Sequence, residues 1–137
     1  MILVDTGPCV ALFDPKDPEH ERCKEVLRKI RDPLYTTVCV LTETFHMLSP
    51  GSQGSDRLRD FISQGGLSVL FMDSAGLQRA FELMEKYADH PMDLADASLI
   101  VAAEELRIFK IFTVDRDDFA TYRIRRGHRY YGVEIIS

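Results

Sequence analysis

Two carboxylates at the start of an apolar segment give the clearest chemical signal in the sequence. In residues 91–106, apolar residues recur at the spacing of one helix face, and Asp96 lies within that face. Asp93 precedes it by about one helical turn, so both side chains point in a similar direction. Two interpretations are open. Either Asp93 is the N-cap and Asp96 a first-turn acid satisfying free N–H groups, or both acids face a cleft and hold a cation.

A cation site would need further acids, and two such acids directly follow short apolar segments. Residues 1–4 and 108–114 each have the pattern of a strand buried on both faces, and the acids Asp5 and Asp115 follow them. Ligands bind at the carboxyl ends of parallel strands, where the strand order reverses. If these two strands are neighbours at that point, Asp5 and Asp115 converge on one crevice near Asp96. For Asp5, the simpler alternative is a turn residue that caps the next helix.

Clustered carboxylates restrict the chemistry of such a site. Ionised carboxylates about 4 Å apart repel by roughly 4 kcal/mol per pair at an effective dielectric constant near 20, so the cluster must bind protons or cations. Oxygen ligands favour Mg²⁺ or Mn²⁺, and the sequence lacks the HxxxH, HxxE and CxxC spacings of zinc sites. Such ions promote phosphodiester cleavage by activating water and stabilising the leaving oxygen. The sequence lacks the GxxxxGK[ST] motif of nucleoside triphosphate enzymes and the GxSxG motif of acyl-transfer enzymes, so neither activity is indicated.

The remaining apolar pattern predicts strands that alternate with helices. We expect strands at residues 1–4, 34–37, 67–72, 108–114 and 133–136, and helices at 9–13, 18–31, 38–48, 56–64, 74–87 and 91–106. The segment SPGSQGS, residues 49–55, is predicted to be a loop. This alternation predicts an α/β protein in which residues 1–137 form a single domain around a parallel sheet covered on both faces.

Composition and charge limit the class of protein, its location and the ligands it could attract. Hydrophobic residues make up 45% of the chain and charged residues 28%, which is ordinary for a soluble globular protein. We expect a cytoplasmic location without membrane contact, because no long apolar run or leader pattern occurs. The net charge of -5 argues against broad non-specific attraction to nucleic acid. One basic run at residues 123–129, RIRRGHR, is either a solvated loop or a phosphate contact.

Four segments follow one another over almost the whole chain: LVDTGPCVALFD at the start, TETF around Glu43, MDLADASLIVAA around Asp96 and FTVDRDDF around Asp115. Together they resemble the PIN domain, in particular the VapC-like toxin ribonucleases. Asp5, Glu43, Asp96 and Asp115 match the acidic quartet of that family. The resemblance alone selects Glu43, because its position on the margin of a helix face would not distinguish it from a solvated glutamate.

The resemblance implies a three-layer α/β/α fold with a central, mostly parallel sheet. It also implies an endoribonuclease that cleaves single-stranded RNA with Mg²⁺ or Mn²⁺. In such an enzyme Asp5, Asp96 and Asp115 would bind the ion or ions, and Glu43 would complete the cluster and position the attacking water. The family further implies homodimers and, for the toxin of a toxin–antitoxin pair, a small antitoxin protein that inserts a segment into the acidic groove.

Further residues near the quartet are auxiliary candidates. We interpret Asp93 as an outer ligand or N-cap and Asp117 as an auxiliary ligand. Thr6 and Thr113 would orient the acids or their waters, the alternative being ordinary strand or cap hydrogen bonds. The basic run supplies candidates for binding the RNA backbone: Arg123, Arg125, Arg126 and Arg129.

Two other functions compete with the nuclease. One is a catalytically inactive PIN-fold module that binds RNA or protein, although all four matched acids are present. The other is a phosphate-accepting receiver domain, which also gathers acids at a parallel sheet. A receiver would need paired acids after the first strand and a lysine after the last. Here Asp5 is followed by Thr6 and Gly7, and the last strand has no lysine nearby.

Overall fold

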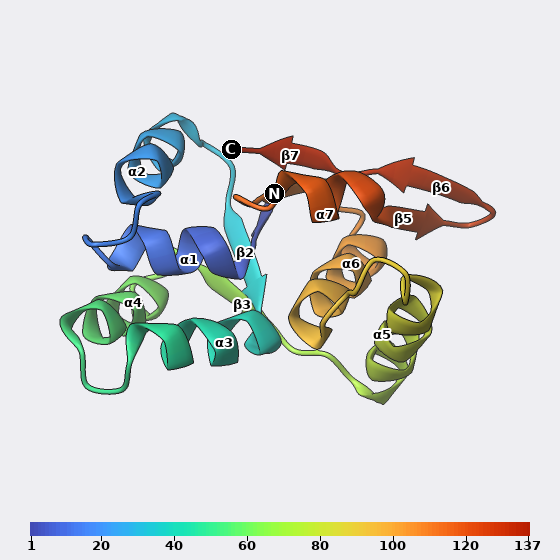
Figure 1. Cartoon of the computed structure of the whole chain (residues 1–137), viewed down its shortest axis with the longest axis horizontal. Coiled ribbons are helices and arrows are strands. Elements are labelled where there is room, and N and C mark those ends of the chain that lie inside the picture. The colour runs from blue at the N-terminus through green and yellow to red at the C-terminus, as the bar shows by residue number, and fades with distance from the viewer.

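The chain folds around a five-stranded parallel sheet in a computed structural model that describes residues 1–137 (Figure 1). The strand order is β3-β2-β1-β4-β7, and every neighbouring pair is parallel. The strands are β1 (Ile2–Val4), β2 (Leu34–Thr37), β3 (Ser68–Leu70), β4 (Lys110–Phe112) and β7 (Glu134–Ile136). The predicted parallel sheet is confirmed. Its centre is β1, which is buried along its whole length because it carries apolar residues towards both faces.

Helices cover both faces of the sheet, which confirms the predicted three layers. Figure 1 shows α1 to α4 on one side and α5 and α6 on the other. The helices are α1 (Thr6–Phe13), α2 (His20–Lys29), α3 (Val38–Leu48), α4 (Gln53–Ser63), α5 (Ser74–Lys86), α6 (Leu94–Leu106) and α7 (Arg116–Thr121). Every residue of α6 from 97 to 103 is buried, as expected for a helix that is apolar on all sides. No helix is both long and apolar enough to span a membrane.

The strand order reverses between β1 and β4. After β1 the chain adds β2 and then β3 on one side, and it returns to add β4 on the other side. Val4 is in register with Phe112, and the backbone N–H of Asp5 donates to the Phe112 carbonyl at 2.9 Å. The predicted pairing of these two strands is therefore confirmed, and the residues that follow each strand emerge at the same edge of the sheet.

The basic run forms a β-hairpin, which the sequence pattern did not predict. The strands β5 (Arg123–Arg126) and β6 (Arg129–Gly132) pair antiparallel around Gly127, whose φ of +63° suits the tight turn. In Figure 1 the hairpin extends from the sheet at the right of the molecule. Of the two alternatives for this run, the solvated loop is therefore wrong. The strands escape a pattern analysis because only Ile124 among their residues is buried.

The predicted loop at residues 49–55 is wrong in its second half. Helix α4 begins at Gln53 and not at residue 56. The hydroxyl of Ser52 accepts a hydrogen bond from the Ser55 N–H at 3.0 Å, which makes Ser52 the N-cap. A serine within a run of small polar residues therefore acts as a helix start, and the true connection between α3 and α4 is shorter.

Replacing Gly7 should show how closely α1 approaches the segment after β4. A Cβ atom on Gly7 would lie 2.5 Å from Cγ2 of Val114. Glycine to alanine inside a helix usually stabilises by about 0.5–1 kcal/mol. Here we expect Gly7→Ala to lower the free energy of unfolding by about 1–3 kcal/mol, because the methyl group overpacks this contact. Urea denaturation would measure the change. Gly132→Ala is the control, since nothing lies within 4 Å of its Cβ position, and a stabilised Gly7→Ala variant would contradict the packing.

Candidate active site

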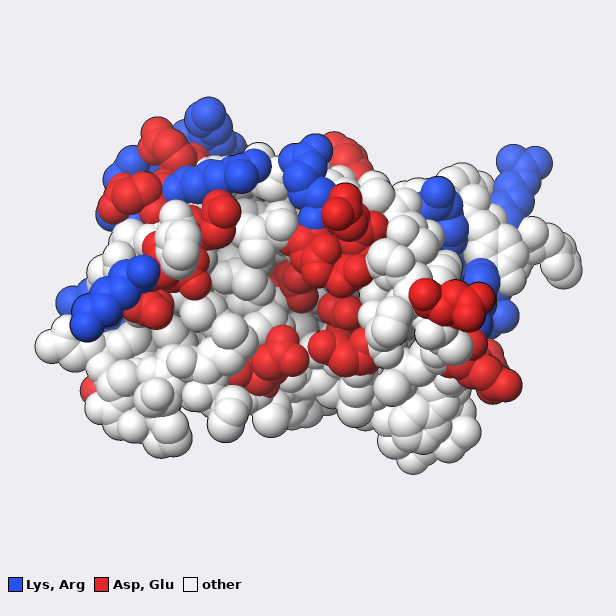
Figure 2. Space-filling model, in the orientation of Figure 1, with Lys and Arg blue, Asp and Glu red and all other residues white.

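Acidic side chains gather in a hollow at the carboxyl edge of the sheet. Figure 2 shows them in the middle of one face, between the helices on either side of the sheet. Asp5 follows β1, Asp115 follows β4, and Asp96 lies in the first turn of α6. The negative charges of Asp93 and Asp115 act on Asp5, and those of Asp93 and Asp5 act on Asp96. No ion pair with a basic group is formed by Asp5, Asp93, Asp96 or Asp115. The structure thus places three of the four matched acids close together.

A single buried threonine connects the acids that follow β1 and β4. The Thr113 hydroxyl donates to Oδ2 of Asp5 at 2.8 Å and accepts from the Asp115 N–H at 2.9 Å. Since Thr113 is fully buried directly after β4, its hydroxyl holds the Asp5 carboxylate and the Asp115 backbone in fixed positions. This is the hydrogen bonding expected of a residue that orients the acids.

In the first turn of α6, one acid caps the helix and the other faces the cleft, so each of the two interpretations of this pair applies to one residue. Oδ1 of Asp93 accepts from the Asp96 N–H at 2.8 Å, so Asp93 is the N-cap. Asp96 is half-buried and points its carboxylate towards the cluster, with the Tyr122 hydroxyl 3.5 Å from its Oδ2. Asp93 therefore acts structurally at the helix start, while Asp96 contributes its carboxyl group to the hollow.

Burial and mutual repulsion make ionisation of these carboxyl groups difficult. Burial raises the pKa of Asp5 to about 6 against the opposing hydrogen bond from Thr113, and the charges of Asp115 and Asp93 raise it further. Burial likewise raises the pKa of Asp96 to about 8, with added repulsion from Asp93 and Asp5. The pKa of Asp115 is also raised, chiefly by burial. A cation that neutralised this charge would remove the repulsion, so the hollow favours bound positive ions at neutral pH.

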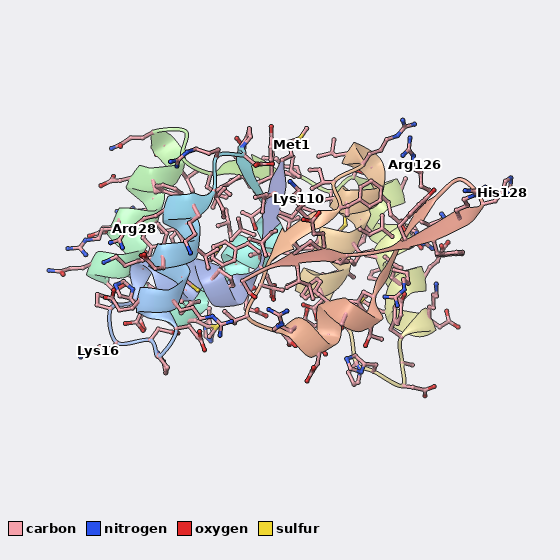
Figure 3. The ribbon with its side chains drawn as sticks, turned by 90° about the horizontal axis from the view of Figure 1, so that it is seen from above. Met1, Lys16, Arg28, Lys110, Arg126 and His128 are labelled. Atoms are coloured by element: carbon pink, nitrogen blue, oxygen red, sulfur yellow. The ribbon has the colours of Figure 1, made fainter.

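The basic run lies apart from the acidic hollow. Figure 3 shows Arg126 and His128 at the end of the molecule opposite Lys16. The backbone N–H of Arg125 donates to Oε2 of Glu104 at 2.7 Å, which attaches β5 to α6. Arg123 donates from its guanidinium to the carbonyls of residues 120, 121 and 122 at the end of α7. The run therefore provides a positive surface that is separate from the acidic hollow.

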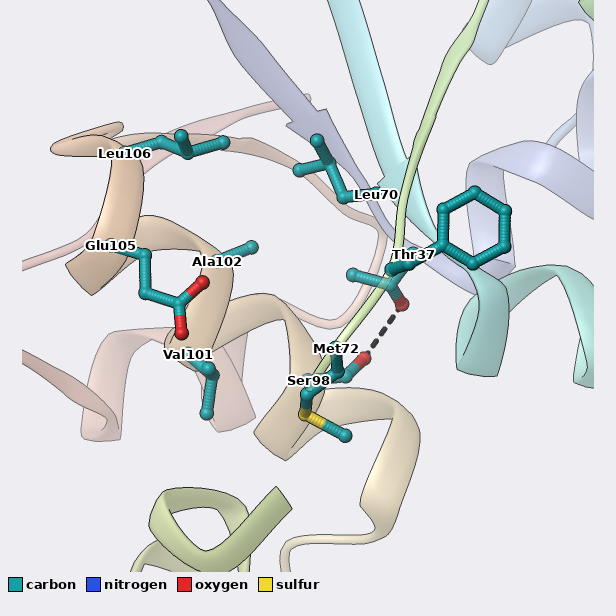
Figure 4. Close-up of a pocket in the computed structure, with 9 residues that line it drawn as sticks. Thr37, Leu70, Met72, Ser98, Val101, Ala102, Glu105 and Leu106 are labelled. Carbon is teal, nitrogen blue, oxygen red and sulfur yellow. Dashed lines mark hydrogen bonds between the residues drawn. The ribbon is translucent and has the colours of Figure 1, made fainter. Parts of the chain in front are cut away.

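Glu43 lies across a groove from the start of α6. It is half-buried on α3 and lines a groove of about 510 Å³ together with His46 and Asp93. A buried contact sets the spacing of the two helices: Thr37, the N-cap of α3, lies 2.6 Å from Ser98 of α6, oxygen to oxygen (Figure 4). The fourth matched acid thus faces the same side as the other three without joining their network.

No sequence pattern marks three residues that lie at the cluster, which are His90, Asp118 and Tyr122. Asp118 in α7 donates its N–H to Oδ1 of Asp115 at 3.1 Å, and its side chain lies 2.5 Å from Nε2 of His90. Tyr122 packs edge-on against the His90 ring with centroids 6.0 Å apart. The signal that could have revealed Asp118 is its position three residues after Asp115, which is the spacing of an N-cap and the residue that it caps. Asp117, the neighbour predicted as an auxiliary ligand, is exposed and affects the cluster by raising the pKa of Asp115.

The donor set fits a divalent ion that keeps part of its hydration shell. Carboxylate oxygens are the ligands that Mg²⁺ and Mn²⁺ prefer. No group of three or more His, Cys, Asp or Glu side chains is arranged to hold a metal ion by itself. One or two carboxylates plus retained waters commonly suffice for Mg²⁺. The hydroxyl of Thr6, next to Asp5, is buried without a hydrogen-bond partner, so a water molecule in the hollow would satisfy it.

Comparison with known proteins identifies a family match over most of the chain. The family model of the PIN domain matches residues 2–124. Ribonuclease VapC26 from Mycobacterium tuberculosis is 25% identical over 131 residues, which cover 94% of this chain and 97% of that protein.

Solved structures confirm the fold. Mycobacterium tuberculosis VapC20, described as a toxin that cleaves the sarcin-ricin loop, matches with a TM-score of 0.78 and 19% identity, over 86% of this chain and 92% of that chain. A toxin–antitoxin complex from Klebsiella pneumoniae gives a TM-score of 0.69 and 19% identity, over 88% and 92%. VapBC2 from Rickettsia felis, solved with a promoter DNA fragment, gives a TM-score of 0.64 and 15% identity, over 98% of this chain and 97% of that chain.

The raised pKa values predict an unusual dependence of stability on pH without divalent ions. Asp5 and Asp96 titrate near 6 and 8 in the folded chain but near 3.8 as free side chains. Between these values the folded state binds more protons than the unfolded state, so their contribution to the unfolding free energy falls as pH rises. We expect Asp96→Asn to be less sensitive than the wild type between about pH 6 and 8. Urea denaturation in a chelator would measure this, and equal slopes would contradict it.

Proposed function

This chain belongs to the PIN domain family, and we propose that it is an endoribonuclease that cleaves single-stranded RNA with Mg²⁺ or Mn²⁺. The observation that carries the proposal is the convergence of Asp5, Asp96 and Asp115 from three distant segments without a basic partner. A structural protein would gain nothing from this repulsion, whereas phosphodiester hydrolysis uses cations held in this way. The similarity to a ribonuclease over nearly the whole chain supports the same activity.

The matched acids divide the work of the proposed site. Asp5, Asp96 and Asp115 would bind the ion or ions, and Glu43 would orient the attacking water from across the groove. The bound cation would supply an activated water and neutralise the leaving oxygen. Thr113 would hold Asp5 and Asp115 in register through its two hydrogen bonds. Thr6 would bind a water in the hollow, Asp93 would keep Asp96 in place as the N-cap, and Asp117 would add charge at the rim.

The partners follow from the same family. We propose that residues 1–137 act as one domain, that the protein is a cytoplasmic homodimer, and that it is the toxin of a toxin–antitoxin pair. A small antitoxin protein would then block the acidic groove. One structure with the same fold is described as a toxin–antitoxin complex and another as a toxin, which supports this assignment. The basic hairpin would bind the RNA backbone, and the candidates for this contact are Arg123, Arg125, Arg126 and Arg129.

A catalytically inactive PIN-fold module is the second candidate. The observation in its favour is that the carboxylates do not form a ready-made three-ligand group. Such a module would bind RNA or protein and would never cut RNA at any Mn²⁺ concentration. The complete acidic quartet favours the enzyme.

Removing single carboxylates should abolish cleavage while preserving the fold. We expect Asp5→Asn and Asp96→Asn to reduce divalent-dependent cleavage of single-stranded RNA by roughly a hundredfold or more, because each removes charge that stabilises the reacting centre. Circular dichroism should remain that of the wild type. Asp60→Asn is a matched control, since Asp60 is exposed on α4. Retained cleavage in both cluster variants would reject the assignment.

Cation binding can be tested without any RNA. We expect Mn²⁺ to raise the melting temperature of the wild type, and to do so more at pH 8 than at pH 5, because protons compete with the ion for Asp5 and Asp96. Differential scanning fluorimetry would measure the shift. Asp60→Asn should respond like the wild type and Asp96→Asn should respond less. An equal response in both variants would show that Mn²⁺ binds elsewhere.

A further inference from the structure

A line of aromatic and cationic side chains runs from the acidic cluster to the hairpin. The Tyr122 hydroxyl lies 3.5 Å from Oδ2 of Asp96, and the Tyr122 ring packs edge-on against Tyr87 with centroids 5.1 Å apart. Nζ of Lys86 lies 5.3 Å from the centroid of Tyr87 and 4.2 Å from that of Tyr130. The end of α5 therefore bridges the candidate active site and β6.

The register of the hairpin separates its side chains into two faces. Ile124 pairs with Tyr131, and Arg125 pairs with Tyr130, so each pair shares one face. Ile124 is buried, and Tyr131 packs edge-on against Phe109 with centroids 5.6 Å apart. Arg125 and Tyr130 therefore lie together on the opposite face, which is the face that Lys86 contacts.

This face combines unpaired positive charge with an exposed aromatic ring. Tyr130 is 54% exposed, and the Lys86 ammonium lies over its ring. Neither Lys86 nor Arg125 forms an ion pair, and the nearby acids Glu82 and Glu104 are both paired with Arg79. Residues 123–132 contain no acid at all, although the whole chain has a net charge of -5. Positive charge next to an exposed aromatic ring is the combination that binds single-stranded nucleic acid.

We propose that Lys86, Arg125 and Tyr130 form a docking strip for the single-stranded RNA of the proposed reaction. In this inference, which rests on the proposed function, an unpaired base stacks on the face of the Tyr130 ring that Lys86 does not cover, while Lys86 and Arg125 bind the adjacent phosphates. An unpaired base is required because a base within a duplex does not expose its ring face. Packing contacts through Tyr87 and the buried Tyr122 connect the strip to the acidic hollow within the fold.

The other hairpin arginines provide internal controls. Arg126 and Arg129 alternate onto the face of Ile124 and Tyr131, away from the strip. Arg123 uses its guanidinium to bind the carbonyls of Ala120 and Tyr122. The strip therefore predicts unequal effects for charges that lie only a few residues apart, whereas a simple basic patch predicts equal ones.

Binding of a labelled single-stranded oligoribonucleotide to the full chain in EDTA tests the strip. We expect Tyr130→Ala to weaken binding at least about fivefold and Tyr130→Phe to bind like the wild type, because the phenyl ring still stacks. With an oligonucleotide that lacks bases, Tyr130→Ala should have no effect. Lys86→Gln and Arg125→Gln should each reduce the slope of log K against log salt by about 0.7, and Arg126→Gln should reduce it less. Wild-type affinity in both Tyr130→Ala and Lys86→Gln would overturn the strip, as would an equal loss for Arg125→Gln and Arg126→Gln.

Cleavage kinetics separate the failure of the strip from the failure of the nuclease assignment. The strip variants should raise KM and leave kcat unchanged, because they lie outside the acidic hollow. Asp96→Asn should abolish cleavage and still bind the oligoribonucleotide. If the wild type binds RNA through the strip but never cleaves it, the nuclease proposal fails and the strip stands. If it cleaves RNA and the strip variants match it in KM, the strip fails alone.

Discussion

Repulsion between buried carboxylates is the constraint on which the rest of this structure depends. Asp5 and Asp96 are held where burial and neighbouring charges raise the pKa of each to about 6 and about 8, respectively. Such an arrangement persists only if packing elsewhere opposes it. The opposing forces are the central position of β1, the burial of α6 and the hydrogen bonds of Thr113. The apolar core therefore stabilises the strained charge distribution that the proposed chemistry requires.

Charge is divided between two regions of the molecule, and the division suits an anionic substrate. The acidic hollow would repel RNA phosphates unless cations were bound there. The hairpin presents positive charge at a distance from the hollow, where it can attract RNA without neutralising the acids. Tyr122 connects the two regions, because it contacts Asp96 and lies directly before β5. Separate surfaces for attraction and for hydrolysis explain how a chain with a net charge of -5 could act on RNA.

The sequence was sufficient for the sheet and for part of the site. The apolar runs before Asp5 and Asp115 predicted two buried strands, and the topology of parallel sheets then predicted that the residues after them would lie close together. Glu43 depended on the family resemblance, since its helix position was uninformative. The hairpin and α7 were missed because they are short and mostly exposed, so little apolar periodicity marks them. His90 and Asp118 meet through tertiary packing that no local pattern encodes.

The most direct test of this account is a crystal structure of the protein grown with Mn²⁺ and measured for anomalous scattering. The account predicts an anomalous peak in the hollow, in contact with the carboxylate of Asp5 and with at least one of Asp96 and Asp115. A map without a peak at this edge of the sheet, at a Mn²⁺ concentration that supports RNA cleavage, would contradict it.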